Sequence, residues 1–455
     1  MRAMGISPAR AAAFEILLRV EREQSYAGEL LHSARFAKFS SADHGLTTEL
    51  VMGVLRWRSW LDCQLAQASS QKLERLDLEV LVALRLGAYQ LKFLSRVPAR
   101  AAIFESVELV KAARKRSAAT FVNAVLRNLA AKLPSGEGGD FADNALAEID
   151  RSDSLKLAQN SAHPEWLVAR WIEHYGLGTT RRICAYDQRP PATSLRIDDD
   201  QSLKELTSEG IELAPGHLLS AARTVLSGEI TRTRAYRSGR VAIQDEGSQL
   251  VALLVGRGEK ILDCCAAPGG KTAVLTARNP AAKIMAVDIH PHRARLLREL
   301  VRGSNVHAVA ADATSLPFSG SFDRILADVP CSGTGTLARN PEIKWRLKPD
   351  DLKDLQARQT AILKSALARV VTGGRVVYST CSIEPEENET IVEAVIGGES
   401  NFSILDCRRQ LEQMQQRGEL NVHRIETLLA GPYLRTIPGV HQCDGFFVAI
   451  IERSA

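Results

Sequence analysis

The chain has 455 residues, of which 45% are hydrophobic and 24% are charged, a balance that is ordinary for a globular protein. Lys and Arg outnumber Asp and Glu by 58 to 53, and the net charge of +5 permits a polyanionic partner without demonstrating one. No stretch approaches the roughly 18 apolar residues of a membrane helix, and residues 1–22 lack the apolar core of a signal peptide. We therefore expect a cytoplasmic chain of two to four domains with no membrane partner.

The eight cysteines are scattered along the chain and form no pair of CxxC motifs. The spacing of a zinc site is absent, and disulfides are not expected in the cytoplasm, so we predict neither a metal nor a disulfide framework. Most cysteines in such a chain are small buried side chains. The eight are Cys63, Cys184, Cys264, Cys265, Cys331, Cys381, Cys407 and Cys443.

Apolar residues recur at helical spacing from residue 7 to about residue 133, for example over Leu76–Leu94 and Ala102–Ala113. No strand pattern interrupts this region, which therefore predicts an all-helical domain. Pro and Gly then cluster at residues 134–140 without apolar periodicity, and this composition indicates a linker.

Residues 150–238 carry a mixed pattern, with a helix predicted at about 154–175 and short strands at Thr193–Ile197 and Thr224–Leu226. From about residue 239 onward, β-rich apolar runs alternate with helical patterns. Such alternation predicts a doubly wound α/β sheet with mostly parallel strands. The strands are expected at Lys260–Cys264, Lys283–Val287, Val306–Ala310, Arg324–Ala327, Arg375–Ser379 and Phe446–Ile451, and the helices at Pro291–Val301 and Pro349–Val371.

The segment Ile261–Thr272 has the pattern of a strand, a tight loop of small residues and the start of a helix. Small residues let a ligand approach the backbone, and the amides of a helix N-terminus favour a negatively charged group. In open α/β sheets, ligands bind at the carboxyl ends of the strands, where this loop would lie. Neither GxxxxGK[ST] nor GxGxxG spacing is present, and the loop by itself could equally be a packing turn.

Two aspartates follow the next strands of the predicted sheet. Asp288 ends the second strand, where an acidic residue commonly accepts hydrogen bonds from a ribose diol. Asp312 ends the third strand and could accept a hydrogen bond from the exocyclic amine of an adenine. Each aspartate alone is more often a helix N-cap, but the ordered series of loop, Asp and Asp favours a nucleoside cofactor.

Cys331 and Cys381 lie just beyond the predicted fourth and fifth strands, so both should face the same crevice. A structural cysteine would be expected inside a strand. A thiolate that adds to carbon-6 of a cytosine makes carbon-5 nucleophilic enough to attack a methyl group. Asp328 could hydrogen-bond to the amino group or the protonated ring nitrogen of that cytosine.

Three motifs in this region resemble the RNA cytosine-5 methyltransferase family. They are DxPCSGTG at Asp328–Gly335, TCS at Thr380–Ser382 and AAPGGK at Ala266–Lys271. The resemblance implies that Cys381 is the nucleophile and that Cys331 assists product release. It further implies an S-adenosyl-L-methionine site made of Cys265, Ala266, Ala267, Pro268, Gly269, Gly270, Lys271, Asp288, Asp312 and Asp328.

The helical region has a resemblance of its own. The segments Asp43–Trp57, Leu86–Leu91 and Phe121–Arg127 look like the NusB family of all-helical RNA-binding bundles. A NusB-like domain ahead of a cytosine-5 methyltransferase resembles the RsmB/NOP family of bacterial 16S ribosomal RNA cytosine-5 methyltransferases. This resemblance implies small-subunit 16S ribosomal RNA as the partner. The segment Pro190–Ile197 looks like the small RNA-recognition-like subdomain that precedes the catalytic domain in the same family.

Together these patterns predict a multidomain protein. Residues 1–140 should form an all-α NusB-like bundle, residues 150–238 a small α+β RNA-recognition-like subdomain, and residues 239–455 an α/β Rossmann-like methyltransferase domain. Nothing in the sequence suggests an obligate dimer, so we expect a monomer.

Three alternatives stay open at this point. The substrate could be a transfer RNA, because the catalytic motifs serve both RNA classes. The chain could be a non-catalytic NusB-like RNA-binding factor, or a redox protein that uses Cys331 and Cys381 as a thiol pair. The cations between Lys111 and Arg116 either contact RNA phosphates or form a solvated helical face.

Overall fold

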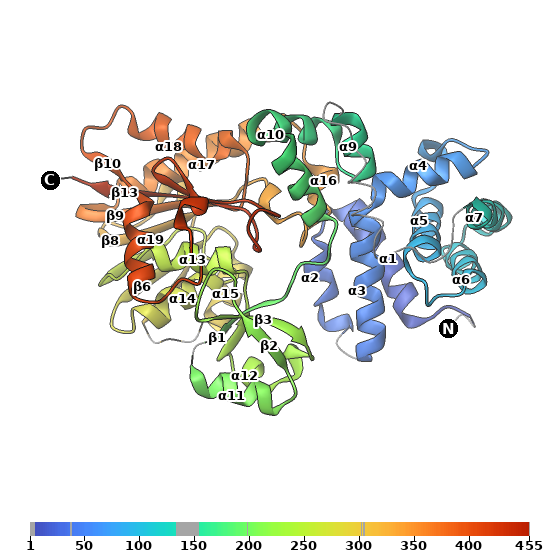
Figure 1. The fold of residues 1–455 in the computed structure, drawn as a ribbon, viewed down its shortest axis with the longest axis horizontal. Coiled ribbons are helices and arrows are strands. Elements are labelled where there is room, and N and C mark those ends of the chain that lie inside the picture. The colour runs from blue at the N-terminus through green and yellow to red at the C-terminus, as the bar shows by residue number, and fades with distance from the viewer. Residues whose placement is uncertain are drawn as a thin grey trace. The chain divides into compact units, whose positions relative to one another are not determined.

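The computed structural model describes residues 5–36, 39–132, 154–197, 199–301, 303 and 305–454, so the predicted linker at 134–140 lies outside the described residues. The chain divides into two compact units (Figure 1). The first contains Met1–Pro190 together with Leu337–Arg346, and the second contains Pro191–Thr336 together with Leu347–Ala455. No helix of the described residues is long and apolar enough to cross a membrane.

The first unit is built from helices, and the predicted all-α domain is confirmed (Figure 1). Helix α5 lies at its centre and contacts α1, α3, α4, α6 and α7. Buried residues occur on every side of α5, as in a helix that is surrounded by others. The helices are α1 (Pro8–Glu23), α2 (Ala27–Leu31), α3 (Ser41–Arg56), α4 (Arg58–Ala68), α5 (Leu78–Phe93), α6 (Ala99–Ala112), α7 (Ala119–Lys132), α9 (Ser154–Asn160), α10 (Glu165–Asp187) and α16 (Ile343–Arg346).

The segment Leu337–Arg346 belongs to the helical unit, although the residues before and after it belong to the second unit. Lys344 in this segment is 1% exposed. Its ammonium group donates to Arg56 O at 2.9 Å, to Ala162 O at 3.0 Å and to Gln188 Oε1 at 3.3 Å. Because Arg56 is the last residue of α3, its carbonyl has no partner within the helix. The Lys344 side chain therefore caps the C-terminal end of α3 by donating a hydrogen bond to this carbonyl.

Trp345 and Arg346 cap helix ends in a similar way. The Trp345 indole donates to Leu55 O at 2.6 Å, one residue before the end of α3. The Arg346 guanidinium donates to Val20 O at 3.0 Å in the last turn of α1 and to Ser25 O at 2.6 Å just beyond it. Buried carbonyls at helix ends need such partners, so this short segment completes the helical unit.

The second unit begins with a small antiparallel sheet in the strand order β2-β3-β1-β4 (Figure 1). Helices α11 (Asp200–Ser208) and α12 (Arg234–Arg237) contribute Leu206 and Ala235 to the core beside this sheet. The predicted small α+β subdomain is confirmed, and β2 and β4 are added to the two strands expected from the sequence. The strands are β1 (Ser194–Ile197), β2 (Glu212–Pro215), β3 (Ala222–Ser227) and β4 (Val241–Ile243).

A nine-stranded mixed sheet forms the body of the second unit, in the order β11-β12-β13-β9-β8-β5-β6-β7, with β10 paired to β13. Strands β9, β8, β5, β6 and β7 are parallel, whereas β10 to β13 pair in antiparallel fashion. The predicted α/β domain is confirmed. The strands are β5 (Lys260–Asp263), β6 (Lys283–Asp288), β7 (Val306–Ala310), β8 (Phe322–Asp328), β9 (Val370–Thr380), β10 (Phe402–Leu405), β11 (Leu429–Ala430), β12 (Tyr433–Thr436) and β13 (Phe446–Arg453).

Alternate residues along the central strands supply two cores, one on each face of the sheet. Leu326 and Val377 belong to the core that α13, α14 and α19 cover. Ile325 and Val376 belong to the core that α17 and α18 cover, while α15 packs on β6 and β7. The helices are α13 (Glu246–Leu254), α14 (Gly270–Arg278), α15 (Pro291–Leu300), α17 (Asp351–Leu367), α18 (Glu389–Ile396) and α19 (Cys407–Gln416).

The burial of Lys344 leads us to predict how the free energy of unfolding depends on pH. Burial lowers the pKa of Lys344 from its ordinary value to about 7, with Asp187 and Cys184 opposing that shift and Arg56 adding to it. Between about pH 7 and the ordinary lysine pKa, the unfolded chain binds a proton that the folded chain does not, so the free energy of unfolding rises with pH. Lys344→Met lacks this contribution. In urea denaturation, the free energy of unfolding of the wild type, taken relative to that of Lys344→Met, should increase by about 1–2 kcal/mol from pH 7 to pH 9.

Lys72→Met is the matched control, because Lys72 is an exposed lysine in the same unit. Its effect on stability should not change with pH over this range. A difference between wild type and Lys344→Met that stays constant from pH 7 to pH 9 would show that Lys344 is charged in the folded chain.

Candidate active site

Cys331 and Cys381 meet at one edge of the large sheet. Strands β8 and β9 are parallel neighbours in which Asp328 pairs with Ser379, so the loops that follow them leave the sheet side by side. The Sγ atoms of Cys331 and Cys381 lie 3.1 Å apart, and both side chains are partly exposed. The two cysteines that the sequence places beyond neighbouring strands therefore form a close pair of thiols.

Two glycines allow the loops around the thiols to approach one another. The backbone amide of Gly335 donates to Cys381 O at 2.9 Å, and that of Gly445 donates to Gly335 O at 2.7 Å. A Cβ atom on Gly335 would lie only 2.3 Å from Gly445 O and 2.8 Å from Cys381 O. The loop after β8, the loop after β9 and the turn before β13 are thus joined through backbone atoms that exclude a side chain.

Lys271 and Asp328 form an ion pair beside the thiols. Lys271 Nζ lies 2.7 Å from Asp328 Oδ2, and the Ser379 hydroxyl donates to Asp328 Oδ1 at 2.7 Å. Burial lowers the pKa of Lys271, but the charges of Asp328, Cys381 and Asp263 outweigh it and raise that pKa above its ordinary value. The ammonium group therefore stays charged, close enough to Cys381 to interact with it.

The surroundings of Cys331 favour the protonated form of its thiol. The hydrogen bond shared with Cys381, burial, and the nearby charges of Cys381 and Glu387 raise the pKa of Cys331 well above its ordinary value. Since the thiolate is the nucleophilic form, Cys331 is a poor nucleophile at neutral pH and can act as a proton donor.

The predicted cofactor loop lies at the carboxyl end of β5. It contains Cys265, Ala266, Ala267, Pro268, Gly269, Gly270 and Lys271, with a cis peptide before Pro268, and it leads directly into α14. Gly269 has φ +111°, and a Cβ atom there would lie 2.6 Å from Val301 Cγ2, so this position requires glycine. No side chain caps the N-terminus of α14. Its first amides therefore offer donors to a negatively charged group.

Asp288 and Asp312 stand at the ends of β6 and β7, where the sequence predicts them. Asp288 Oδ1 accepts from the His290 amide at 2.8 Å, and Asp312 Oδ1 accepts from the Thr314 amide at 2.9 Å. The Thr314 hydrogen bonds lower the pKa of Asp312, which keeps it ionised. Each aspartate thus accepts a hydrogen bond from the backbone amide two residues ahead. This is the capping role expected from the sequence as the more common one for a single aspartate.

Asp263 is a buried acidic residue that the motif analysis did not single out. It ends β5, is 1% exposed, and accepts from Thr272 Oγ1 at 2.7 Å. Burial raises its pKa to about 7. The charge of Asp328 adds to this rise, whereas the Thr272 hydrogen bond and the charge of Lys271 oppose it. Its Oδ1 has no hydrogen-bond partner among the residues that the structure describes. An acidic residue inside an otherwise apolar strand is the signal that could have identified it.

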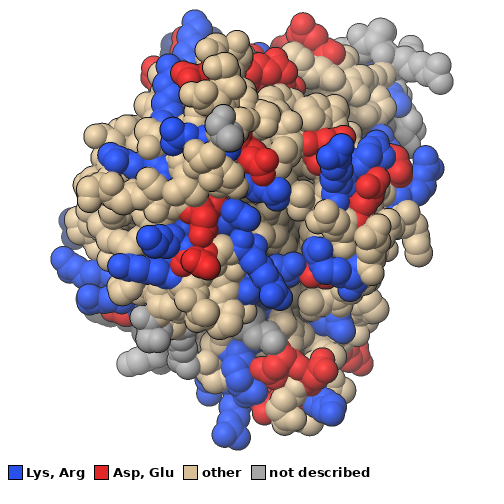
Figure 2. All heavy atoms as spheres, turned by 90° about the vertical axis from the view of Figure 1, so that its left-hand side faces the viewer, with Lys and Arg blue, Asp and Glu red and all other residues tan. Residues whose placement is uncertain are grey.

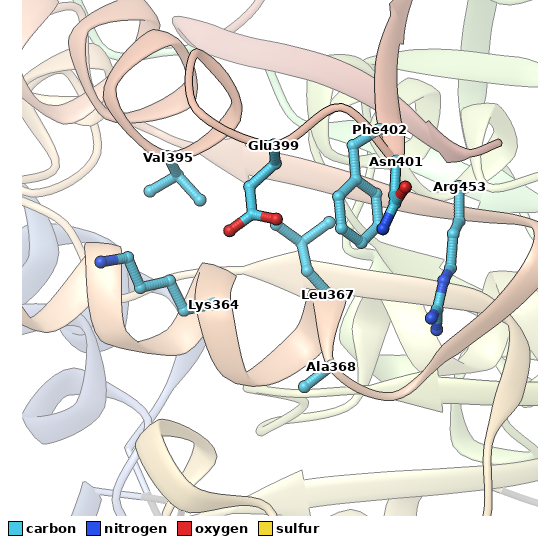
Figure 3. A pocket seen from close by; sticks show the side chains of 8 residues that line it. All are labelled: Lys364, Leu367, Ala368, Val395, Glu399, Asn401, Phe402 and Arg453. Atoms are coloured by element: carbon cyan, nitrogen blue, oxygen red, sulfur yellow. The ribbon is translucent and has the colours of Figure 1, made fainter.

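A separate cavity of about 440 Å³ lies beside α17, α18, β10 and β13 (Figure 3). It is lined by Lys364, Leu367, Ala368, Val395, Glu399, Asn401, Phe402 and Arg453, and none of these is a predicted site residue. The Arg453 guanidinium stacks over the Phe402 ring at 6.0 Å and donates to Val370 O at 2.8 Å. Of the two cationic residues that line the cavity, Lys364 and Arg453, the second is therefore already bound to other parts of the protein.

Three family descriptions match the chain along its length. "NusB family" matches residues 7–131, "Methyltr_RsmF/B-like, ferredoxin-like domain" matches 163–226, and "16S rRNA methyltransferase RsmB/F" matches 250–452. The chain is 33% identical over 460 residues to the probable ribosomal RNA small subunit methyltransferase B of Bacillus subtilis, which covers 98% of each chain. It is 34% identical over 395 residues to the ribosomal RNA small subunit methyltransferase B of Pseudomonas syringae pv. tomato, covering 83% of this chain and 84% of the relative.

Solved structures share the fold. The crystal structure of PH0851 has a TM-score of 0.78 at 21% identity and covers 98% of this chain and 99% of that one. NSun6 from Pyrococcus horikoshii, solved with SFG, has a TM-score of 0.56 at 18% identity and covers 65% of this chain and 99% of that one.

From the close contact at Gly335 we predict that an alanine at this position destabilises the folded chain. Gly335→Ala places a methyl group against the carbonyls of Gly445 and Cys381, so the two loops must separate. We expect the free energy of unfolding to fall by about 1–3 kcal/mol, measured by chemical denaturation. Gly320→Ala is the control, because a Cβ atom at Gly320 meets nothing within 4 Å. Equal stabilities of the two variants would contradict the packing described here.

Proposed function

This chain belongs to the 16S rRNA methyltransferase RsmB/F family, and from that membership we propose a specific reaction for it. It transfers a methyl group from S-adenosyl-L-methionine to carbon-5 of a cytosine in 16S rRNA, through a covalent adduct with Cys381. The observation that carries this proposal is the pair of sulfurs 3.1 Å apart beside the Lys271–Asp328 ion pair.

The two thiols have different roles in this proposal. Cys381 Sγ adds to carbon-6 of the cytosine, and the electron pair displaced to carbon-5 then forms the bond to the methyl group. A base then accepts the carbon-5 proton, the bond from carbon-6 to Sγ breaks, and Cys381 leaves as a thiolate while the aromatic ring is restored. The assignment of attack to Cys381 and of product release to Cys331 follows the family resemblance of the TCS and PCS segments. In this proposal, Asp328 accepts a hydrogen bond from the amino group or the protonated ring nitrogen of the cytosine.

The residues around the glycine loop fit S-adenosyl-L-methionine, which supplies an electrophilic methyl group. Besides Asp263 Oδ1, the buried Oε1 of Gln244 has no hydrogen-bond partner among the described residues, and the Gln244 amide lies 3.4 Å from the Cβ position of Gly270. Acceptors without partners beside an uncapped helix N-terminus suit a ligand that carries both an ammonium and a carboxylate group. The residues proposed to hold it are Cys265, Ala266, Ala267, Pro268, Gly269, Gly270, Lys271, Asp288, Asp312 and Asp328.

The charged surface is compatible with an RNA partner but does not locate the RNA. Lys and Arg side chains gather in several groups on the face drawn in Figure 2, with Asp and Glu side chains among them. In the helical unit, Lys111 Nζ lies 2.7 Å from Glu108 and Lys115 Nζ lies 2.9 Å from Asp77. These pairs favour the interpretation of the Lys111–Arg116 cluster as a solvated helical face.

The reaction is tested with the full chain, labelled S-adenosyl-L-methionine and unmodified RNA. Label should appear in 16S rRNA as 5-methylcytidine after nuclease digestion and chromatography. A transfer RNA transcript serves as the second substrate, and preferential labelling of it would replace the rRNA proposal. RNA binding without transfer to either RNA would favour the non-catalytic alternative.

The roles of the thiols are tested by comparing Cys381→Ala with Cys331→Ala. Cys381→Ala should abolish both methyl transfer and the covalent RNA adduct, because no thiolate attacks carbon-6. Cys331→Ala should let the adduct accumulate, because release is slowed. The measurement is a denaturing gel on which the adduct migrates as RNA-linked protein. The reverse pattern of adducts would exchange the two roles.

A further inference from the structure

Glu387 is a fully buried carboxylate that hydrogen-bonds to both thiol loops. It ends a short turn after β9 and is 0% exposed. Its Oε1 accepts from the Ser332 amide at 2.8 Å and from Gln359 Nε2 at 2.8 Å. Its Oε2 accepts from the hydroxyls of both Ser332 and Ser382 in short hydrogen bonds. Neutral donors from three segments thus surround one carboxylate.

The two serines directly follow the two cysteines in the sequence, since Ser332 follows Cys331 and Ser382 follows Cys381. The serine hydroxyls lie 3.0 Å from each other, and the cysteine sulfurs lie 3.1 Å apart. A group that ties the serines together therefore also determines how closely the sulfurs approach.

The surrounding contacts hold Glu387 in place. The Tyr378 hydroxyl donates to its carbonyl at 2.6 Å, and the next residue, Asn388, donates through Nδ2 to Ser382 O at 2.9 Å. Gln359 Nε2 also donates to Pro330 O at 2.9 Å, on the loop that carries Cys331. Burial of a carboxylate destabilises the fold unless its oxygens are hydrogen-bonded, and both oxygens of Glu387 are. These hydrogen bonds join the two thiol loops rigidly.

We propose that Glu387 is a positioning residue that clamps the loop of Cys331 to the loop of Cys381 and so sets the separation of the two sulfurs. It does not touch the reacting atoms. Its contribution to methyl transfer rests on the proposed function, in which both thiols act on one pyrimidine ring. The clamp itself is a property of the folded chain and is measurable without RNA or cofactor.

The test measures the effective concentration of the two thiols in glutathione redox buffers. At equilibrium, two protein thiols and one oxidised glutathione yield one Cys331–Cys381 disulfide and two reduced glutathione molecules, so atoms and electrons balance. After acid quenching, peptide mass spectrometry gives the fraction of the Cys331–Cys381 disulfide. The equilibrium constant reports how closely the fold holds these two sulfurs.

Glu387→Ala removes all four hydrogen bonds that the carboxylate accepts. It should lower the effective concentration of the two thiols by at least about tenfold. Glu387→Gln keeps the shape and one carbonyl oxygen, and serine hydroxyls can reverse to accept from its amide, so it should stay within about threefold of wild type. Recovery by the isosteric variant separates a positioning role from a general loss of stability.

Glu246 offers the matched control. It is also 0% exposed and accepts from the backbone amides of His217, Leu218 and Leu219 at 2.8 Å, none of which belongs to the thiol loops. Glu246→Ala removes a comparable buried carboxylate and should leave the Cys331–Cys381 equilibrium unchanged. An equal fall in both alanine variants would overturn the proposal, because it would show only a general loosening.

If thermal melting shows that Glu387→Ala does not fold, the double variant Ser332→Ala, Ser382→Ala takes its place. It keeps the carboxylate but removes the two hydroxyls that connect the loops, and it should lower the effective concentration several-fold. A wild-type value in this variant, or a wild-type chain that forms no Cys331–Cys381 disulfide, would overturn the clamp. Failure of the wild-type chain to methylate any RNA would defeat the proposed function and leave the thiol measurement standing.

Discussion

The parallel pairing of β8 with β9 is the contact on which the site depends. Leu326 pairs with Val377 and Asp328 with Ser379, so both strands end at the same edge of the sheet. Parallel neighbours must send their following loops in the same direction, and here those loops carry Cys331 and Cys381. Strand β5 lies on the other side of β8, and its loop brings Lys271 to Asp328. Three neighbouring strands therefore assemble the thiols, the cation and the glycine loop.

The loop after β8 serves two parts of the molecule. Its first residues carry Cys331, and its continuation, Leu337–Arg346, belongs to the helical unit. There Lys344 and Trp345 satisfy carbonyls at the end of α3 that helix geometry leaves without partners. The covalent path from thiol to cap is short, and backbone hydrogen bonds of Gly335 hold its beginning in place. A single loop thus carries one of the two thiols and also completes the helical unit.

Several contacts near the site join residues that are far apart in the sequence. Glu387 lies 55 residues from Ser332, and Lys344 lies 288 residues from Arg56. Neither contact has a local pattern, because a buried Glu or Lys looks like any surface residue until its partners are known. The short strands β2, β4, β10, β11 and β12 escaped prediction for a related reason, since two to four residues carry only a weak periodicity.

The sequence by itself determined the division into helical, mixed and α/β regions, because apolar periodicity follows directly from which faces are buried. It also determined that Cys331 and Cys381 stand at strand ends, because their motifs follow apolar strand-forming runs. Only the tertiary structure decided that the two sulfurs lie 3.1 Å apart, and that Asp263, Glu387 and Lys344 are buried among specific partners. The reason is physical: distance and burial arise from packing between segments, which no single stretch of sequence encodes.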